Sequence, residues 1–320
     1  MTTAMATTDL DTTGGGESTS GGVQEPTEIA HVTDFDALGL DLRDDLLFIA
    51  AATSGLQIFD IATPSEPSLI TEVPLDAVAY EVAVHGDYAF VADWSAGLQV
   101  VEISNPNTAS VVETIPTPTN ALAVAADSTR VVVGTWNADF ENPDPEHGIV
   151  VYPSTGPWMN PAQLATPGWA GGLALVGDLA FVADGPGGLH VISLLGPSEV
   201  STTPTSVRAY GVAVANNRAY VADNTGGLLI FDIQDPGTPV EIGNIDLPGA
   251  AYGVDVDDSA GVAWVACDTG GVQRVDVSDP DSLMVLDDLP TTRAWGVHLT
   301  DSLALVADTM GGLRIFERPS

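Results

Sequence analysis

Residues 208–250 read RAYGVAVANNRAYVADNTGGLLIFDIQDPGTPVEIGNIDLPGA, and this stretch decides the fold. It contains four short apolar segments, at residues 211–214, 219–222, 228–233 and 240–245. An Asn-Asn turn, a glycine hairpin and a Pro-containing loop separate them. Short apolar runs bounded by Asn, Gly, Asp and Pro are typical of β-strands joined by turns. The stretch therefore predicts a unit of four β-strands.

The same unit recurs along the chain. Alignment on the glycine before the third strand gives Gly55, Gly97, Gly148, Gly188, Gly227, Gly271 and Gly312, which are 39 to 51 residues apart. Four strands in about 40 residues correspond to one blade of a β-propeller, whereas a parallel β-helix has a much shorter repeat. The sequence thus predicts an all-β fold, a seven-bladed β-propeller of four-stranded blades.

The two ends of the chain predict how the ring closes. The last unit stops after its third strand, residues 313–317, so its fourth strand is missing. Residues 28–32 near the start match residues 241–245, the fourth strand of the clearest unit. An N-terminal strand that completes the last blade would join the two ends and cover exposed strand edges. We therefore expect the propeller to span residues 25–320.

The charge is extreme. The chain has 44 acidic residues and 8 basic ones, a net charge of −36, and all the basic residues are Arg. Such a chain repels itself in dilute salt, whereas at molar salt the Debye length falls to about 3 Å. The absence of Lys and the excess of Asp resemble haloarchaeal proteins, which predicts a salt-adapted source. Nucleic acid is not an expected partner, because its phosphates would meet a field of their own sign.

Residues 1–24 are rich in Thr, Ser, Gly and Asp, and we expect a disordered acidic tail. They lack the basic and apolar regions of a secretory signal, and no apolar run in the chain predicts a transmembrane segment. Because such a tether is similar to that of exported haloarchaeal proteins, we expect an extracellular or cell-surface location, with a cytoplasmic one as the alternative. The single cysteine, Cys267, excludes an internal disulfide and is expected to be a small buried side chain.

The third strands carry a family resemblance. Residues 56–60, 98–102 and 228–232 read LQIFD, LQVVE and LLIFD. They resemble the LVIVD repeat of archaeal and bacterial propellers, many of which are at the cell surface. The resemblance covers residues 28–320 and implies the propeller fold, but it implies little about function. The third unit departs furthest, because residues 149–153 lack the acidic end and residues 136–147 carry an insertion, expected to be an exposed acidic loop.

Aromatic side chains gather on one predicted face, which we call the top face. It is formed by the hairpins between second and third strands and by the connections between units. Its aromatic and Arg residues are Trp94, Trp136, Tyr80, Trp169, Tyr210, Tyr252, Trp295, Arg208 and Arg293. They either wedge between blades and pair with Asp, or form a binding surface, where such residues are the usual anchors. A partner protein, a small anionic ligand or a carbohydrate would suit such a surface.

Five units are predicted to have an Asp just before the top-face hairpin: Asp93, Asp184, Asp223, Asp268 and Asp308. We expect these carboxylates to accept hydrogen bonds from N–H groups of the hairpin. A carboxylate ring that binds a hard cation is the alternative.

The first strands are expected to line the central channel, and most are small and apolar. One aligned position has Ala83, Ala125, Ala174 and Ala213, but Asp255, His298 and Asp41 in units six, seven and one. These three units are neighbours once the ring closes. Their polar side chains either form hydrogen bonds within the channel wall or hold a divalent cation and perform acid–base chemistry.

The sequence has no phosphate-binding glycine loop, no Gly-x-Ser-x-Gly motif and no His-rich metal motif. It therefore favours a non-catalytic binding or scaffold propeller without a cofactor, which presents its top face to a partner protein or ligand. The alternative is a metal-dependent hydrolase or lactonase with a channel site formed by Asp41, Asp255 and His298.

Overall fold

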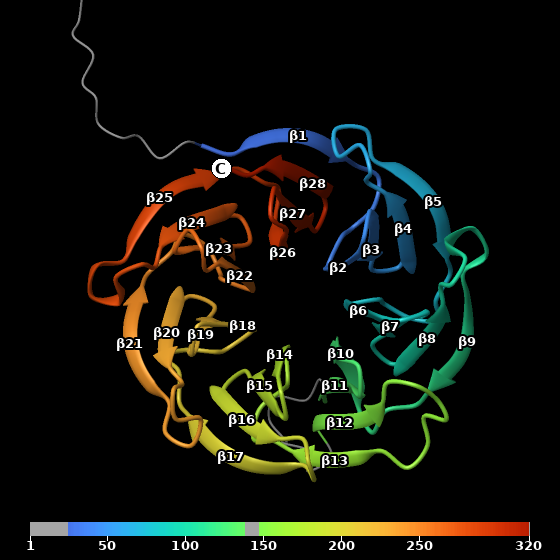
Figure 1. The fold of residues 1–320 in the computed structure, drawn as a ribbon, viewed down its shortest axis with the longest axis horizontal. Helices are drawn as coiled ribbons and strands as arrows, with labels where there is room; N and C mark the ends of the chain where they lie inside the picture. Colours follow the sequence, from blue (N-terminus) through green and yellow to red (C-terminus); the bar gives the residue numbers. More distant parts are fainter. Residues whose placement is uncertain (1–24, 138–146, 320) are drawn as a thin grey trace, which may run out of the picture.

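The computed structural model describes residues 25–137 and 147–319. In these residues the chain forms seven four-stranded antiparallel sheets, arranged as blades around a central channel (Figure 1). The predicted seven-bladed propeller is therefore confirmed. The described residues form only two helical segments, the short 3₁₀ turns η1 (Pro106–Thr108) and η2 (Pro280–Ser282), and no helix there is long and apolar enough to cross a membrane.

The first three blades follow one another along the chain. Blade 1 consists of β2 (Gly39–Arg43), β3 (Leu46–Ala50), β4 (Leu56–Asp60) and β5 (Ser68–Val73). Blade 2 consists of β6 (Glu81–His85), β7 (Tyr88–Ala92), β8 (Leu98–Glu102) and β9 (Ser110–Ile115). Blade 3 consists of β10 (Asn120–Ala126), β11 (Arg130–Trp136), β12 (Gly148–Pro153) and β13 (Ala162–Ala165).

The remaining blades complete the ring. Blade 4 consists of β14 (Gly172–Val176), β15 (Leu179–Ala183), β16 (Leu189–Ser193) and β17 (Ser198–Thr203). Blade 5 consists of β18 (Gly211–Ala215), β19 (Arg218–Ala222), β20 (Leu228–Asp232) and β21 (Val240–Ile245). Blade 6 consists of β22 (Gly253–Asp257), β23 (Val262–Ala266), β24 (Val272–Asp276) and β25 (Met284–Leu289). Blade 7 combines β26 (Ala294–Leu299), β27 (Leu303–Asp308) and β28 (Gly312–Glu317) with β1 (Thr27–Val32) from the start of the chain.

The hydrophobic core lies between neighbouring blades. In one cluster, Phe181 and Val191 of blade 4 pack against Val221 and Phe231 of blade 5. Side chains alternate between the two faces of a strand, so a blade held between two neighbours buries both faces of its middle strands. This requirement explains why the second and third strands are almost continuously apolar.

The start of the chain closes the ring as the sequence predicted. β1 pairs antiparallel with β28, with Val32 opposite Leu313, and it forms the outer edge of blade 7 (Figure 1). Ile29 and Val32 pack against the apolar cluster between blades 7 and 1. The Arg314 guanidinium lies 3.2 Å from the Glu28 carboxylate. The N-terminal strand thus contributes both backbone pairing and side-chain packing to the last blade.

The aligned glycines mark a turn that needs glycine. All seven have a positive φ, for example 75° at Gly227, a conformation that other residues adopt only with strain. A Cβ on Gly227 would also collide with the carbonyl oxygen of Ile245 in the outer strand. The glycine that defines the repeat is therefore required both by its backbone conformation and by close packing.

Candidate ligand-binding site

The aromatic residues predicted for the top face form a continuous arc around the mouth of the channel. Neighbouring ring centroids lie 4.3 to 5.8 Å apart along the order Tyr80, Trp94, Trp136, Trp169, Tyr210, Tyr252 and Trp295. Within the described residues this is an unbroken series of seven rings. The structure thus brings all seven of these predicted site residues together, and we call them the aromatic arc.

Backbone geometry explains why three of these rings, Tyr80, Tyr210 and Tyr252, face the channel. The residue before an innermost strand donates its backbone N–H to the carbonyl oxygen of the last residue of the second strand. Tyr210 donates in this way to Ala222, and Tyr252 donates to Ala266. This bond extends the innermost hairpin by one residue, so the side chain at that position is directed to the channel mouth. Blade 4 has Gly171 there, and an added Cβ would lie 3.3 Å from the Trp169 ring, which occupies the space instead.

The two predicted arginines lie at the arc but have different partners. The Arg208 guanidinium stacks 5.7 Å from the centroid of the Trp169 ring. The Arg293 guanidinium forms an ion pair with Asp268, with 2.6 Å between Nε and Oδ1. Arg293 therefore pairs with an acidic side chain, whereas Arg208 already uses an aromatic face.

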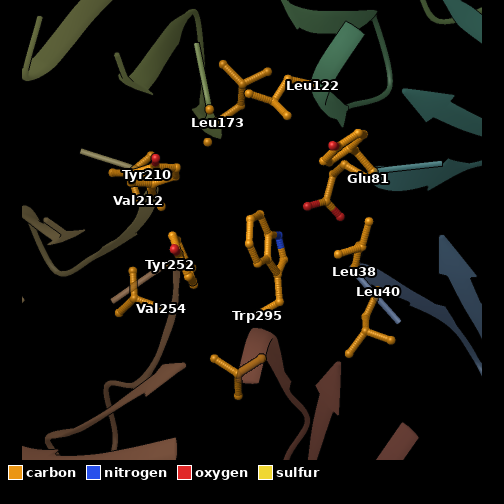
Figure 2. Close-up of a pocket in the computed structure, with 18 of the residues that line it drawn as sticks. Leu38, Leu40, Glu81, Leu122, Leu173, Tyr210, Val212, Tyr252, Val254 and Trp295 are labelled. Carbon is orange, nitrogen blue, oxygen red and sulfur yellow. The ribbon is translucent and has the colours of Figure 1, made fainter. Parts of the chain in front are cut away.

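The arc surrounds a cavity of about 340 Å³. Six of its rings contribute to the lining, and aliphatic side chains such as Leu122, Leu173 and Val254 contribute the rest. Figure 2 shows Trp295 and Glu81 projecting into this space. Glu81 is the one charged residue in the lining among the residues that the structure describes. A cavity of this size, lined by aromatic and aliphatic side chains and a single charged group, is typical of a small-molecule site.

Glu81 has an unusual position in the repeat. It is the first residue of β6 and lies opposite Ala92, where the other blades have Gly39, Ala123, Gly172, Gly211, Gly253 and Gly296. A Cβ on Gly39 of the neighbouring blade would collide with the Glu81 side chain. Blade 1 therefore leaves room for a carboxyl group that six of the seven blades lack.

The environment of Glu81 favours its neutral form. Burial in the channel wall, together with the negative charge of Asp41, raises the pKa of this carboxyl group to about 8, against the opposing effect of hydrogen bonds from backbone N–H groups. The N–H of Val82 is one of these donors, 3.2 Å from Oε1. Sequence reasoning missed Glu81. The available signal was the alignment of first strands, two residues before Ala83, where one Glu interrupts a column of Gly and Ala.

The three polar residues of the channel wall lie together as predicted. Asp41 accepts hydrogen bonds from the N–H groups of Leu42 and Val84, the latter in blade 2. Asp255 accepts equivalent bonds from Val256 and, in blade 7, from Leu299. Each carboxylate thus joins the innermost strands of two neighbouring blades, which is the structural alternative that the sequence left open.

Burial raises the pKa of Asp41 and of Asp255, and His298 lies close enough to both carboxyl groups to oppose this shift. No group of three His, Cys, Asp or Glu side chains within residues 25–137 and 147–319 is arranged to hold a metal ion. The divalent-cation alternative therefore stays a prediction, and the described part of the chain contains no cluster of ligands for it.

The Asp residues near the hairpins differ from the prediction in two ways. The Asp223 carboxylate accepts the N–H of Val207, and Asp93 accepts those of Asp76 and Ala77, all in connections between blades rather than in the hairpin. The reason is that the buried carboxylate points along the blade toward the incoming connection. In addition, the residue that follows the second strand of blade 6 is Cys267, so Asp268 is shifted by one position and is not equivalent to Asp93, Asp184, Asp223 and Asp308.

The structure describes Cys267, but it does not describe most of the two acidic segments that the sequence predicted. Cys267 is buried as expected, and burial raises the pKa of its thiol to about 12. Most of the predicted acidic insertion of blade 3, residues 138–146, and the predicted tail, residues 1–24, lie outside the described residues.

The LVIVD repeat model matches residues 36–74, 78–117, 167–201 and 208–247. These segments correspond to blades 1, 2, 4 and 5, so the LVIVD resemblance is confirmed in four repeats. No curated protein matches the chain.

Solved structures share the architecture at low sequence identity. The WD40 β-propeller domain of Doa1 has a TM-score of 0.72 at 12% identity and covers 92% of this chain and 98% of its own. The β-propeller domain of Myceliophteria thermophila Cps50 (Swd1) has a TM-score of 0.72 at 9% identity, with coverages of 92% and 100%. The computationally designed Ika8 protein has a TM-score of 0.65 at 12% identity, with coverages of 91% and 99%. At these identities the similarity shows the fold alone.

Proposed function

We propose that this protein is a non-catalytic binding propeller that receives a ligand, or a side chain of a partner protein, in the aromatic mouth of its channel. The observation that carries the proposal is the aromatic arc around a cavity of about 340 Å³. Tyr and Trp provide large apolar contact with few rotatable bonds, which makes them frequent anchors of binding sites.

The other aromatic residues of the chain provide a comparison. Trp264 is fully buried between blades, and Trp158 packs edge-on against Tyr88 and Phe90. By contrast, Trp295 and Tyr252 stay partly exposed although they contact each other, whereas Trp169 of the arc is buried. Rings that served only to hold blades together would be covered in the same way as Trp264. Their exposure to the cavity therefore favours a role in binding.

The channel carboxylates support a non-catalytic reading. Both Asp41 and Asp255 use their two oxygens to accept backbone N–H groups, which fixes the innermost strands. These bonds give both carboxylates a structural role in the channel wall, which accounts for their presence without a reaction.

We further propose that this binding takes place in concentrated salt at the cell surface. The support is compositional: 44 acidic residues, no Lys, and an N-terminal segment rich in Thr, Ser and Gly. A strongly negative surface remains hydrated and soluble where salt screens its self-repulsion.

Fluorine NMR of protein labelled with 5-fluorotryptophan tests the site directly. The chain has six Trp residues, so single Trp→Phe variants assign six signals. A panel of carbohydrates, carboxylates and organic ammonium ions is expected to include a ligand that shifts the signals of Trp136, Trp169 and Trp295. The signals of Trp158 and Trp264 provide an internal control and should not move. A panel that leaves every mouth signal unchanged would contradict the proposal.

A further inference from the structure

We propose that the ligand of this site is an organic ammonium cation, held by the faces of the aromatic arc and by the Glu81 carboxylate. This inference rests on the proposed function and specifies its ligand class.

The rings provide suitable surfaces for a cation. Trp295 and Tyr252 are stacked with centroids 4.3 Å apart and an angle of 24°, and Figure 2 shows the Trp295 ring standing in the cavity. The electronegative face of an aromatic ring attracts alkylated ammonium groups within about 6 Å of its centroid. Arg208 already makes this type of contact with Trp169 in the same arc. The arc therefore accepts a cation on at least one of its faces.

Glu81 has no cationic partner on the described chain. Apart from His, Arg is the only basic residue type in the chain. Each Arg side chain contacts a residue other than Glu81. The partners of the eight guanidinium groups are Gly86 for Arg43, Asp178 for Arg130, Trp169 for Arg208, Val277 for Arg218, Asp287 for Arg274, Asp268 for Arg293, Asp308 for Arg314 and Asp257 for Arg318. Within the described residues no Arg or His side chain forms an ion pair with Glu81, so a cation that pairs with this carboxylate would come from a bound ligand.

The remaining lining favours alkyl groups over hydroxyl groups. Besides the rings, the side chains of the cavity wall are mostly aliphatic, among them Leu122, Leu173, Val212 and Val254 (Figure 2). A carbohydrate would need several hydrogen-bond partners at this depth, whereas the methyl groups of a quaternary ammonium ion need only apolar contact. An anion would meet Glu81 and the nearby Asp41 in a chain of net charge −36. The chemistry of the wall thus selects an alkylated cation.

Binding of a cation should be coupled to ionisation of Glu81. Burial raises the pKa of this group to about 8, so below that pH a cation must displace a proton to obtain a full counter-charge. Affinity should rise with pH by up to about tenfold per unit until the pH exceeds this value. Burial also raises the pKa of Tyr80, Tyr210 and Tyr252, which therefore stay neutral over this range.

Other charged groups face the channel from neighbouring strands. Asp41 of β2 lies close enough to repel the Glu81 charge. Asp255 of β22 and His298 of β26 interact with each other further along the wall. The arginines at the rim, Arg208 and Arg293, contact Trp169 and Asp268. A variant of Glu81 is therefore needed to assign the pH dependence to this carboxyl group.

Calorimetry with choline and its uncharged carbon isostere, 3,3-dimethyl-1-butanol, tests the inference between about pH 6 and about pH 9. Choline should bind at least about tenfold more tightly than the isostere, more so at the higher pH, where the carboxylate is ionised. Glu81→Gln should remove both the preference and the pH dependence. Glu241→Gln, the same change on an exposed outer strand, should alter neither. Trp295→Leu, which retains the carboxyl group, should weaken choline binding several-fold.

The outcomes separate the two proposals. If the isostere binds as tightly as choline and Glu81→Gln changes nothing, the cation inference fails while the aromatic mouth remains a ligand site. If choline affinity instead falls above about pH 8, a protonated Glu81 donates a hydrogen bond, and the ligand class is wrong. If neither compound binds and no panel member shifts a mouth tryptophan, both proposals fail. Thermal melting of each variant verifies that it is folded.

Discussion

Asp223 illustrates how a single buried carboxylate fixes the connection between two blades. Its side chain is fully buried at the end of β19, and Oδ2 accepts the N–H of Val207 at 2.7 Å. Burial raises the pKa of this carboxyl group, and the hydrogen bonds that it accepts lower it. The carboxylate thus satisfies backbone donors of a connection that has no strand of its own to pair with.

Replacement of this side chain should be costly. Asp223→Ala leaves the partly buried N–H of Val207 without its acceptor, and we expect the free energy of unfolding to fall by about 1–3 kcal/mol. Asp232→Ala is the control, because Asp232 is exposed and accepts only the N–H of Gln234. This control should cost less than about 0.5 kcal/mol. Urea denaturation of both variants measures the difference in the free energy of unfolding. Equal losses in the two variants would show that the Asp223 hydrogen bond stabilises the fold no more than the exposed one.

Glu81 should make folding stability depend on pH. Its pKa is about 8 in the folded protein, above the ordinary value of 4.5. The folded state therefore binds the proton more tightly than the unfolded state, and the associated stability is complete below about pH 4.5 and lost as the pH rises through about 8. Asp184, with a pKa raised to about 7 by burial, contributes in the same direction.

A single substitution isolates the contribution of Glu81 to this pH dependence. Glu81→Gln should raise the melting temperature at about pH 9 relative to wild type and change it little at about pH 5, because the amide carries no charge at either pH. Melting curves of both proteins across this range provide the test. A variant that loses stability as steeply as wild type above neutral pH would assign the effect to Asp184 or to another group.

At the residue scale the sequence predicted positions better than partners. The aligned column of Ala83, Asp41, Asp255 and His298 is correct because strand register follows from the repeat itself. The acceptor role of Asp93 was also correct, but its donors lie in a connection whose path the sequence does not specify. Glu81 could be recognised as a site residue only once the structure showed that the first residue of β6 faces a cavity.

At the scale of elements, β1 is the piece that completes the ring. Five of its six residues pair with β28, and Ile29 and Val32 cover the apolar cluster between blades 7 and 1. Without it, blade 7 would expose the edge of β28, and both backbone pairing and apolar burial would be lost.

Deletion of residues 25–36 should therefore lower the melting temperature strongly, by ten degrees or more as an order of magnitude. A synthetic peptide of residues 25–36 added in excess should bind the open edge of β28 and restore part of the loss. A peptide of the same composition in scrambled order should not. Differential scanning calorimetry gives the melting temperature of the wild type and of the deletion variant alone, with the peptide and with the scrambled peptide. An unchanged melting curve after the deletion would contradict closure by this strand.

The elements themselves were largely predictable, because each unit repeats the same turn residues and the same apolar runs. The predicted strands at residues 211–214 and 240–245 differ from β18 and β21 by at most one residue at an end. Blade 3 was less predictable, since β10 contains a bulge between Ala121 and Ala123 that no local turn signal announces. The aromatic arc required the closed ring, which brings together seven connections and hairpins that are distant in sequence.

At the scale of the whole molecule, charge and architecture oppose each other. A propeller closes on itself with every blade in contact with two neighbours, and here those blades carry 44 acidic residues against 8 Arg. Most ion pairs among the described residues are formed by a few Arg side chains, such as Arg130 and Arg314. The majority of the described carboxylates therefore form no ion pair. We therefore expect the surrounding salt to stabilise the compact ring against its own field.

The melting temperature should consequently rise steeply with KCl concentration. The Debye length is about 10 Å at 0.1 M salt and about 3 Å at 1 M, so repulsion between carboxylates on different blades is largely removed over that range. Sucrose at matched osmolality is the control, because it favours compact states by exclusion from the surface but does not screen charge. KCl should raise the melting temperature far more than sucrose. If the two have the same effect, or if the protein melts at the same temperature in dilute and molar KCl, then self-repulsion is not what limits its stability, and the acidic surface needs another explanation.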